Sequence, residues 1–125
     1  MEQNVLIVDD SLINRELLQY ILQDRYQVYQ AENGAQAIEM IQSRERIYRL
    51  MLLDIQMPVM DGYEAAAAIR ASATPYTLSL PIVAMTANAF AEDVILAKKS
   101  GMNEHLAKPI DISQLYAVMK RWLAA

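Results

Sequence analysis

The hydrophobic residues of this chain are gathered into short runs that are separated by longer amphipathic stretches. Four runs are mostly apolar, VLIV at 5–8, LMLL at 50–53, PIVAM at 81–85 and HLA at 105–107, and a weaker run, YQVYQA, lies at 26–31. Continuous apolar runs of this length are typical of strands that are buried on both faces. The pattern therefore predicts five strands at these positions.

Patterns with helical spacing follow each of these runs. They predict helices over 12–24, 34–47, 62–72, 89–100 and 111–123. The first predicted helix carries an apolar stripe that is expected to face the core, made of Leu17, Leu18, Ile21 and Leu22. Asn33 and Asp111 are suited to begin helices, and Gly101 is suited to end one. Segment 72–80 is expected to be a surface loop.

Strands and helices alternate strictly along the chain. This alternation favours an α/β fold with a parallel sheet, right-handed crossovers and helices on both faces. The 125 residues suit a single doubly wound (βα)5 domain over 1–125.

Composition narrows the classes of function. The chain is 54% hydrophobic, has a net charge of −4 and contains no cysteine. An acidic chain without a basic patch is not expected to bind nucleic acid directly. The absence of cysteine excludes disulfides and thiolate metal sites. No apolar stretch approaches the length of a membrane span, so we expect a cytoplasmic protein without direct membrane contact.

The ends of the predicted strands carry the polar chemistry. Asp9 and Asp10 follow the first strand, Asp54 the third and Thr86 the fourth, and Lys108 ends the fifth. In a parallel sheet these ends meet at one edge, where ligands bind. Two carboxylates about 4 Å apart repel by roughly 4 kcal/mol at an effective dielectric near 20. One lysine does not neutralise three acids, whereas Mg²⁺ with a phosphoryl group does.

Lys108 is followed directly by a proline. We expect Lys108 to pair with Asp54 at rest and with a phosphoryl oxygen after transfer, and Pro109 to set the turn that aims it. The alternatives are a solvated lysine at a strand end and turn acids that only cap helices.

Four segments of the chain match the motifs of one family. VLIVDD at 5–10, LLDIQMPVMDGYEA at 52–65, PIVAMTANA at 81–89 and GMNEHLAKPI at 101–110 resemble a response-regulator receiver domain of two-component signalling. The resemblance covers nearly the whole chain and is strongest to the receivers of hybrid sensor histidine kinases. It implies a flavodoxin-like sheet with strand order 2-1-3-4-5.

The resemblance also implies roles for individual residues. Asp54 would accept a phosphoryl group from a phosphohistidine, and Thr86 and Lys108 would bind the phosphoryl oxygens. The implied Mg²⁺ ligands are Asp9, Asp10, Asp54 and the backbone carbonyl of Gln56. Pro58 and Gly62 would shape the loop after Asp54, Asp61 would cap the next helix, and the Lys108–Pro109 peptide would be cis. Gln56 and Asn88 would tune the slow hydrolysis of the acyl phosphate.

A switch and a docking surface are implied as well. Thr86 would move inward after phosphorylation, and His105, which stands where the family usually has Tyr or Phe, would rotate with it. The alternative is a partly buried histidine without a switching role. Leu12, Ile13 and Arg15 are expected to dock the dimerisation domain of a histidine kinase or a histidine phosphotransfer domain. The receiver is expected to be a monomer or a weak, phosphorylation-dependent dimer.

Three other functions fit parts of the pattern. A phosphohydrolase of the haloacid-dehalogenase type also uses a strand-end Asp, but it needs an acid two positions later, where this chain has Gln56. A flavodoxin-like cofactor binder would need a Gly- and Ser-rich phosphate loop in place of Asp9 and Asp10. A receiver-like scaffold that works without phosphate would not need the complete polar set.

Overall fold

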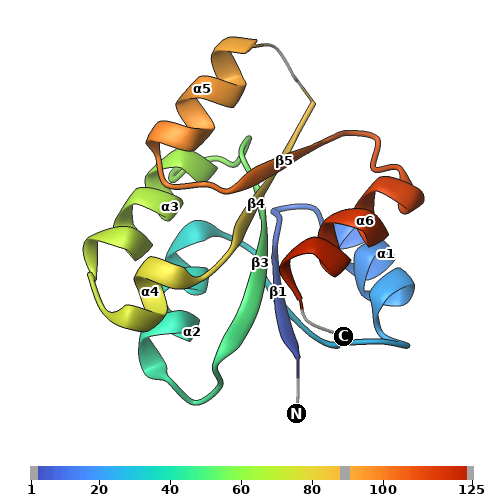
Figure 1. The fold of residues 1–125 in the computed structure, drawn as a ribbon, viewed down its shortest axis with the longest axis horizontal. Helices are drawn as coiled ribbons and strands as arrows, with labels where there is room; N and C mark the ends of the chain where they lie inside the picture. The colour runs from blue at the N-terminus through green and yellow to red at the C-terminus, as the bar shows by residue number, and fades with distance from the viewer. Residues whose placement is uncertain (1–2, 88–90, 124–125) are drawn as a thin grey trace.

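A five-stranded parallel sheet forms the centre of the computed structural model, which describes residues 3–87 and 91–123 (Figure 1). The strands are β1 (Asn4–Val8), β2 (Gln27–Ala31), β3 (Tyr48–Asp54), β4 (Ile82–Thr86) and β5 (Glu104–Ala107). Their order is β2-β1-β3-β4-β5, and every neighbouring pair is parallel. The predicted flavodoxin-like sheet and its strand order are confirmed.

The helices form a layer on each side of the sheet. They are α1 (Leu12–Leu22), α2 (Gly34–Ser43), α3 (Gly62–Ala71), α4 (Pro75–Ser79), α5 (Ala91–Lys99) and α6 (Ile112–Trp122). Figure 1 shows α1 and α6 on one side of the sheet and α2, α3, α4 and α5 on the other. The predicted beginning of a helix at 89 lies outside the described residues.

Strand side chains alternate between two hydrophobic clusters, one under each helical layer. In β1, Leu6 and Val8 pack with α2 and α3 side chains, whereas Val5 and Ile7 pack with α1 and α6 side chains. All four are completely buried. The absence of polar alternation along β1 therefore reflects burial of both faces.

The prediction of a loop over 72–80 is wrong, because Pro75–Ser79 forms the short helix α4. Thr74 caps this helix, and its side chain and that of Thr77 each accept a hydrogen bond from the other's backbone N–H. Pro75 occupies the first helical position, where its missing N–H leaves no bond unmade. A Thr-Pro start was the sequence signal for a helix of this length.

Two further expectations differ from the structure. The helix predicted over 34–47 ends at Ser43, because Arg44 adopts the left-handed conformation at φ 57° and breaks the helical path. Leu17 was placed on the core stripe of α1, but its side chain is 56% exposed, whereas Leu18 and Leu22 are buried. Across residues 3–87 and 91–123, no helix is both long and apolar enough to cross a membrane.

Candidate functional site

Three carboxylates meet where the ends of β1 and β3 lie side by side. Asp9 and Asp10 follow β1, and Asp54 is the last residue of β3. Each offers an oxygen, and these oxygens all lie within 4.8 Å of one another. Asp9 and Asp54 are buried, whereas Asp10 is exposed. The structure therefore brings the predicted acids together, and their oxygens form a hard-ligand set that suits Mg²⁺.

Lys108 extends over two of these acids from the turn after β5. Its Nζ lies 3.1 Å from Oδ1 of Asp54 and 3.5 Å from Oδ2 of Asp9. The Lys108–Pro109 peptide is cis, as expected. The Lys108 backbone N–H donates to the Thr86 carbonyl at 2.8 Å, which ties the turn to the end of β4. The expected resting ion pair between Lys108 and Asp54 is thus present.

The pKa of Asp54 lies above that of an ordinary carboxyl group. Burial is the main cause, and the neighbouring Asp9 charge raises the pKa further. Lys108 and the Gln56 backbone N–H, which donates to Asp54 Oδ1 at 3.1 Å, oppose the shift. One ammonium group therefore does not fully offset the crowding of buried acids, and a divalent cation would relieve it.

The loop after Asp54 is shaped by Gly62 and Asp61. A Cβ added to Gly62 would lie 2.7 Å from the Asp54 carbonyl oxygen and from the Ile55 Cα, so only glycine fits there. Asp61 caps α3, and Glu64 donates its N–H to Asp61 while its carboxylate accepts from the Asp61 N–H. The predicted cap is confirmed. Pro58 and the Gln56 side chain are exposed on the same loop.

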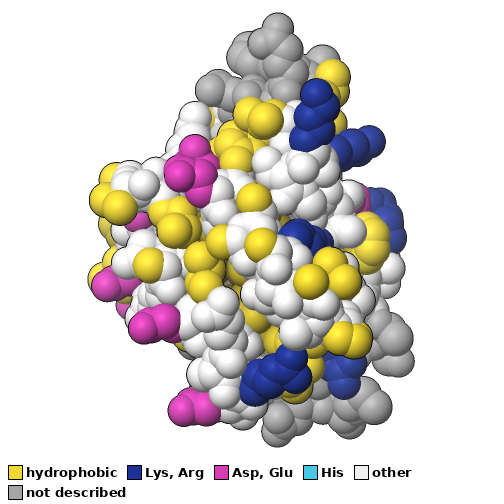
Figure 2. Space-filling view, turned by 90° about the vertical axis from the view of Figure 1, so that its left-hand side faces the viewer, with side chains coloured by type: hydrophobic (Ala, Val, Ile, Leu, Met, Phe, Trp, Pro, Cys, Tyr) yellow, Lys and Arg dark blue, Asp and Glu magenta, His cyan; other side chains and the backbone are white. Residues whose placement is uncertain are grey.

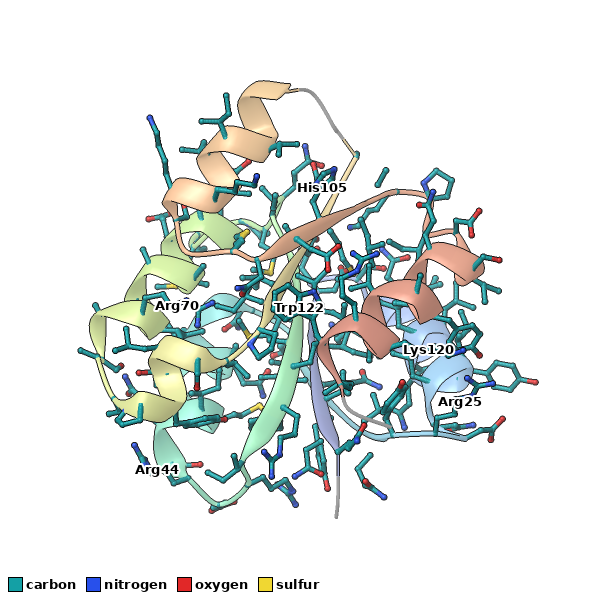
Figure 3. All side chains as sticks on the ribbon, viewed as in Figure 1. Arg25, Arg44, Arg70, His105, Lys120 and Trp122 are labelled. Atoms are coloured by element: carbon teal, nitrogen blue, oxygen red, sulfur yellow. The ribbon has the colours of Figure 1, made fainter. Side chains whose placement is uncertain are left out.

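The predicted switch residues occupy neighbouring strands. Thr86 is buried at the end of β4, beside Ala107 of β5. His105 of β5 pairs with Ala84 of β4, and its side chain is exposed, so the alternative of a partly buried histidine does not hold (Figure 3). Asn88, the predicted rate-tuning residue, lies outside the described residues.

The exposed face of α1 differs from the predicted docking set. Leu12 and Ile13 are exposed as expected, but the placement of Arg15 there is wrong, because its side chain is only 8% exposed. Its guanidinium bonds inward to the Asp9 carbonyl and to Gln30. Sequence reasoning missed Leu17 and Tyr20, which are both exposed. Their spacing from Ile13, four and seven residues, was the signal for a second apolar stripe on this helix.

A cleft joins this face of α1 to the acidic site. It encloses about 220 Å³ and is lined by Asp9, Asn14, Leu17, Leu18, Ile21, Met85, Lys108, Pro109 and Ile110. Apolar side chains from α1 and from the turn after Lys108 form its walls, and a carboxylate and an ammonium group lie among its lining residues. The cleft therefore runs from the exposed Leu17 of α1 to Lys108 at the acidic site.

Comparison with known sequences finds similar proteins along almost the whole chain. The family model described as the response regulator receiver domain matches residues 5–120. The sensor protein GacS of Pseudomonas syringae pv. syringae is 42% identical over 120 residues. That match covers 94% of this chain but only 13% of GacS, so the chain spans a small part of this relative.

Solved structures agree in fold along almost the whole chain. The receiver domain of sensor histidine kinase PA1611 from Pseudomonas aeruginosa PAO1, which has a magnesium ion coordinated in its active site cleft, is 32% identical with a TM-score of 0.87. That match covers 100% of both chains. A chain in the co-crystal structure of the Saccharomyces cerevisiae histidine phosphotransfer protein Ypd1 and the Ssk1 receiver domain is 32% identical, with a TM-score of 0.85. It covers 97% of this chain and 88% of that one.

Proposed function

Because the chain belongs to the response regulator receiver domain family, we propose that Asp54 accepts a phosphoryl group from a phosphohistidine on a partner protein. The convergence of Lys108, Asp9 and Asp10 on Asp54 carries this proposal. An Asp54 oxygen attacks phosphorus, the bond between phosphorus and the imidazole nitrogen breaks, and its electron pair stays on that nitrogen. The product is an acyl phosphate on the buried carboxylate.

The surrounding residues have separate roles in this transfer. Asp9, Asp10, Asp54 and the Gln56 carbonyl would hold Mg²⁺, which shields the negative charge that develops on the phosphoryl oxygens. Lys108 leaves Asp54 and pairs with a phosphoryl oxygen, and the Thr86 hydroxyl donates to another. Gln56 and Asn88 flank the acyl phosphate and tune its slow hydrolysis. The residue two positions after Asp54 is an amide, which disfavours a phosphohydrolase of the haloacid-dehalogenase type.

Phosphorylation is then read out through the end of β4. Thr86 moves toward the phosphoryl group, which makes room beside β5 for the exposed His105 ring to turn inward. Thr86 is already buried one strand away from His105, which supports this coupling. Proton NMR signals of His105, recorded before and after phosphorylation, test the switch, since a ring that stays in water keeps its signals unchanged.

The partner docks on α1. Leu12 and Ile13, joined by Leu17 and Tyr20, present an exposed apolar surface that leads into the cleft at Lys108. Such a surface fits the helical face of a histidine phosphotransfer domain or of a kinase dimerisation domain. The Ypd1–Ssk1 complex supports a partner of the first kind. The receiver itself acts as a monomer or as a weak dimer after phosphorylation.

Intact mass after incubation with acetyl phosphate tests the acceptor directly. We expect one phosphoryl adduct on the wild type with Mg²⁺, little without it, and none on Asp54→Asn. An adduct on Asp54→Asn would place the acceptor elsewhere. A wild type that neither gains an adduct nor releases inorganic phosphate from the donor would favour the phosphate-independent scaffold.

A further inference from the structure

Arg15 is a charged residue that is buried beside the acidic turn. Its Nη1 donates to the Asp9 carbonyl at 2.7 Å, and its Nε donates to Gln30 Oε1 at 3.0 Å. Among the ion pairs of residues 3–87 and 91–123, none involves Arg15. Two neutral oxygens therefore hold this buried cation, and loss of either would leave an expensive unmet donor.

The hydrogen bond from Arg15 to the Asp9 carbonyl is one of three that hold the Asp9–Asp10 turn in place. The Asp9 N–H donates to the Ala31 carbonyl at 3.2 Å, and Asp9 Oδ1 accepts from the Ser11 N–H at 2.9 Å. Because a peptide unit is planar, fixing the Asp9 carbonyl also fixes the amide that begins Asp10. Arg15 thus acts on both acids of the turn, although it contacts neither carboxylate.

A second polar contact fixes the guanidinium itself. Gln30 of β2 accepts from Arg15 through Oε1 and donates through Nε2 to Gln19 Oε1 of α1. The planar guanidinium presents its two donors at fixed directions, so bonds to Asp9 and Gln30 together determine its orientation. The ammonium group of a lysine does not present two donors at fixed directions, so it would not be oriented in the same way.

We infer that Arg15 is a positioning residue that holds the Asp9–Asp10 turn in the arrangement that binds Mg²⁺, an inference that rests on the Mg²⁺ site of the proposed function. A positive charge that acted only through electrostatics would instead weaken the binding of Mg²⁺. If charge alone mattered, removing Arg15 would remove the repulsion between its guanidinium and Mg²⁺, and Mg²⁺ would bind more tightly. If position matters, removing Arg15 weakens binding, as loss of groups behind metal ligands commonly does by about 10- to 100-fold. The sign of the change distinguishes the two.

The test is an NMR-detected Mg²⁺ titration of the unphosphorylated chain. We compare wild type, Arg15→Met, Arg15→Lys and Gln30→Met, and use Arg25→Met as the control. Arg25 is an exposed arginine over the Tyr116 ring, so its removal changes the net charge equally and leaves the acidic turn intact. We expect Arg15→Met to raise the Kd for Mg²⁺ about tenfold, Arg15→Lys and Gln30→Met to raise it less, and Arg25→Met to leave it unchanged.

Each outcome bears on a distinct claim. An unchanged or lower Kd in folded Arg15→Met overturns the positioning role while the acceptor function stands. If Arg15→Met does not fold, Gln30→Met carries the test, because it removes one of the two contacts that orient the guanidinium and leaves the charge in place, and an unchanged Kd there overturns the role. A wild type that binds no Mg²⁺ overturns both this inference and the Mg²⁺ dependence of the proposed function.

Discussion

The Nζ of Lys108 lies 3.1 Å from Oδ1 of Asp54, yet the pKa of Asp54 remains raised. Burial of the carboxylate, with the neighbouring Asp9 charge, outweighs the attraction of the ammonium group. The folded chain therefore disfavours the ionised form of Asp54 relative to an unfolded chain. Binding of a divalent cation would relieve this crowding of negative charge.

Asp54→Asn is expected to stabilise the protein at pH 7 in the presence of a chelator. A raised pKa means that the folded protein keeps a proton which the unfolded chain has already released. Stability therefore falls as pH rises from the ordinary carboxyl value through the raised folded value. Asp54→Asn has no carboxyl group to ionise here, so its stability should depend less on pH between these two pKa values. Urea denaturation between pH 4 and pH 8 measures the difference.

The control for Asp54→Asn is Asp10→Asn. Asp10 shares the acidic cluster but is exposed, so its charge is screened by water and its removal should stabilise the chain less. Added Mg²⁺ should stabilise the wild type more than either variant, because both lose a ligand. An Asp54→Asn chain that is less stable than wild type in chelator would contradict the crowded-acid interpretation.

Lys108→Met should destabilise the protein by about 2 kcal/mol at pH 7, since it removes a partly buried partner of two acids. The loss should shrink below the raised pKa of Asp54, because a protonated carboxyl no longer needs the cation. Thermal or urea unfolding at pH 7 and at a series of acidic pH values provides the comparison. Equal losses at all of these pH values would mean that the charge of Asp54 does not account for the loss.

The charged residues at the strand ends form the part of the site that the sequence predicts well. Asp9, Asp54 and Lys108 follow apolar runs, and a parallel sheet brings strand ends to one edge whatever the details of packing. Arg15 shows what it predicts poorly. An arginine at the start of a surface helix is usually exposed, and only the positions of the Asp9 carbonyl and Gln30 in three dimensions reveal that it is buried.

Helix α1 and helix α4 illustrate the same limit. Leu17 and Leu18 are adjacent, and both suit an apolar stripe, but packing against the sheet decides that Leu18 alone is buried. Segment 72–80 has no apolar period from which to predict a helix. Its helix depends on the Thr74 cap and on Arg70, which donates to the Thr77 and Gly101 carbonyls from α3.

Gly62→Ala is expected to destabilise the chain by about 1–3 kcal/mol and to slow phosphorylation. The added methyl would meet backbone atoms at 2.7 Å, including the Asp54 carbonyl oxygen, so the loop after Asp54 must shift. Gly34→Ala is the matched control. Its nearest atoms are the Met60 Sδ at 2.9 Å, within a flexible side chain, and the Ala65 Cβ at 3.1 Å, so the shifts it requires are smaller than those at Gly62. Urea unfolding and acetyl phosphate labelling of both variants measure the contrast.

Leu17→Glu should slow transfer from a phosphorylated histidine phosphotransfer protein about tenfold, equivalent to roughly 1.4 kcal/mol of lost binding. Labelling by acetyl phosphate should slow less, because the small donor needs no docking surface on α1 and meets only the added charge in the shared cleft. Leu78→Glu is the control, since Leu78 of α4 is 57% exposed, close to the 56% of Leu17. It belongs to the opposite helical layer, whose face shows hydrophobic side chains interspersed with acidic and basic ones (Figure 2). Equal transfer rates for both variants would place the docking surface elsewhere.

Val59→Asn should stabilise the chain by about 0.5–1 kcal/mol. Val59 has a φ of 69°, in the left-handed region that a β-branched side chain rarely adopts, whereas asparagine tolerates it. The side chain is 105% exposed, so the substitution removes no packing. Val59→Ala should gain less: both variants lose the branch and keep the Cβ, but only asparagine has a side chain that can hydrogen-bond locally in this conformation. Urea denaturation in chelator compares the three chains, and a Val59→Asn variant no more stable than Val59→Ala would show that the surrounding loop stores no strain at this position.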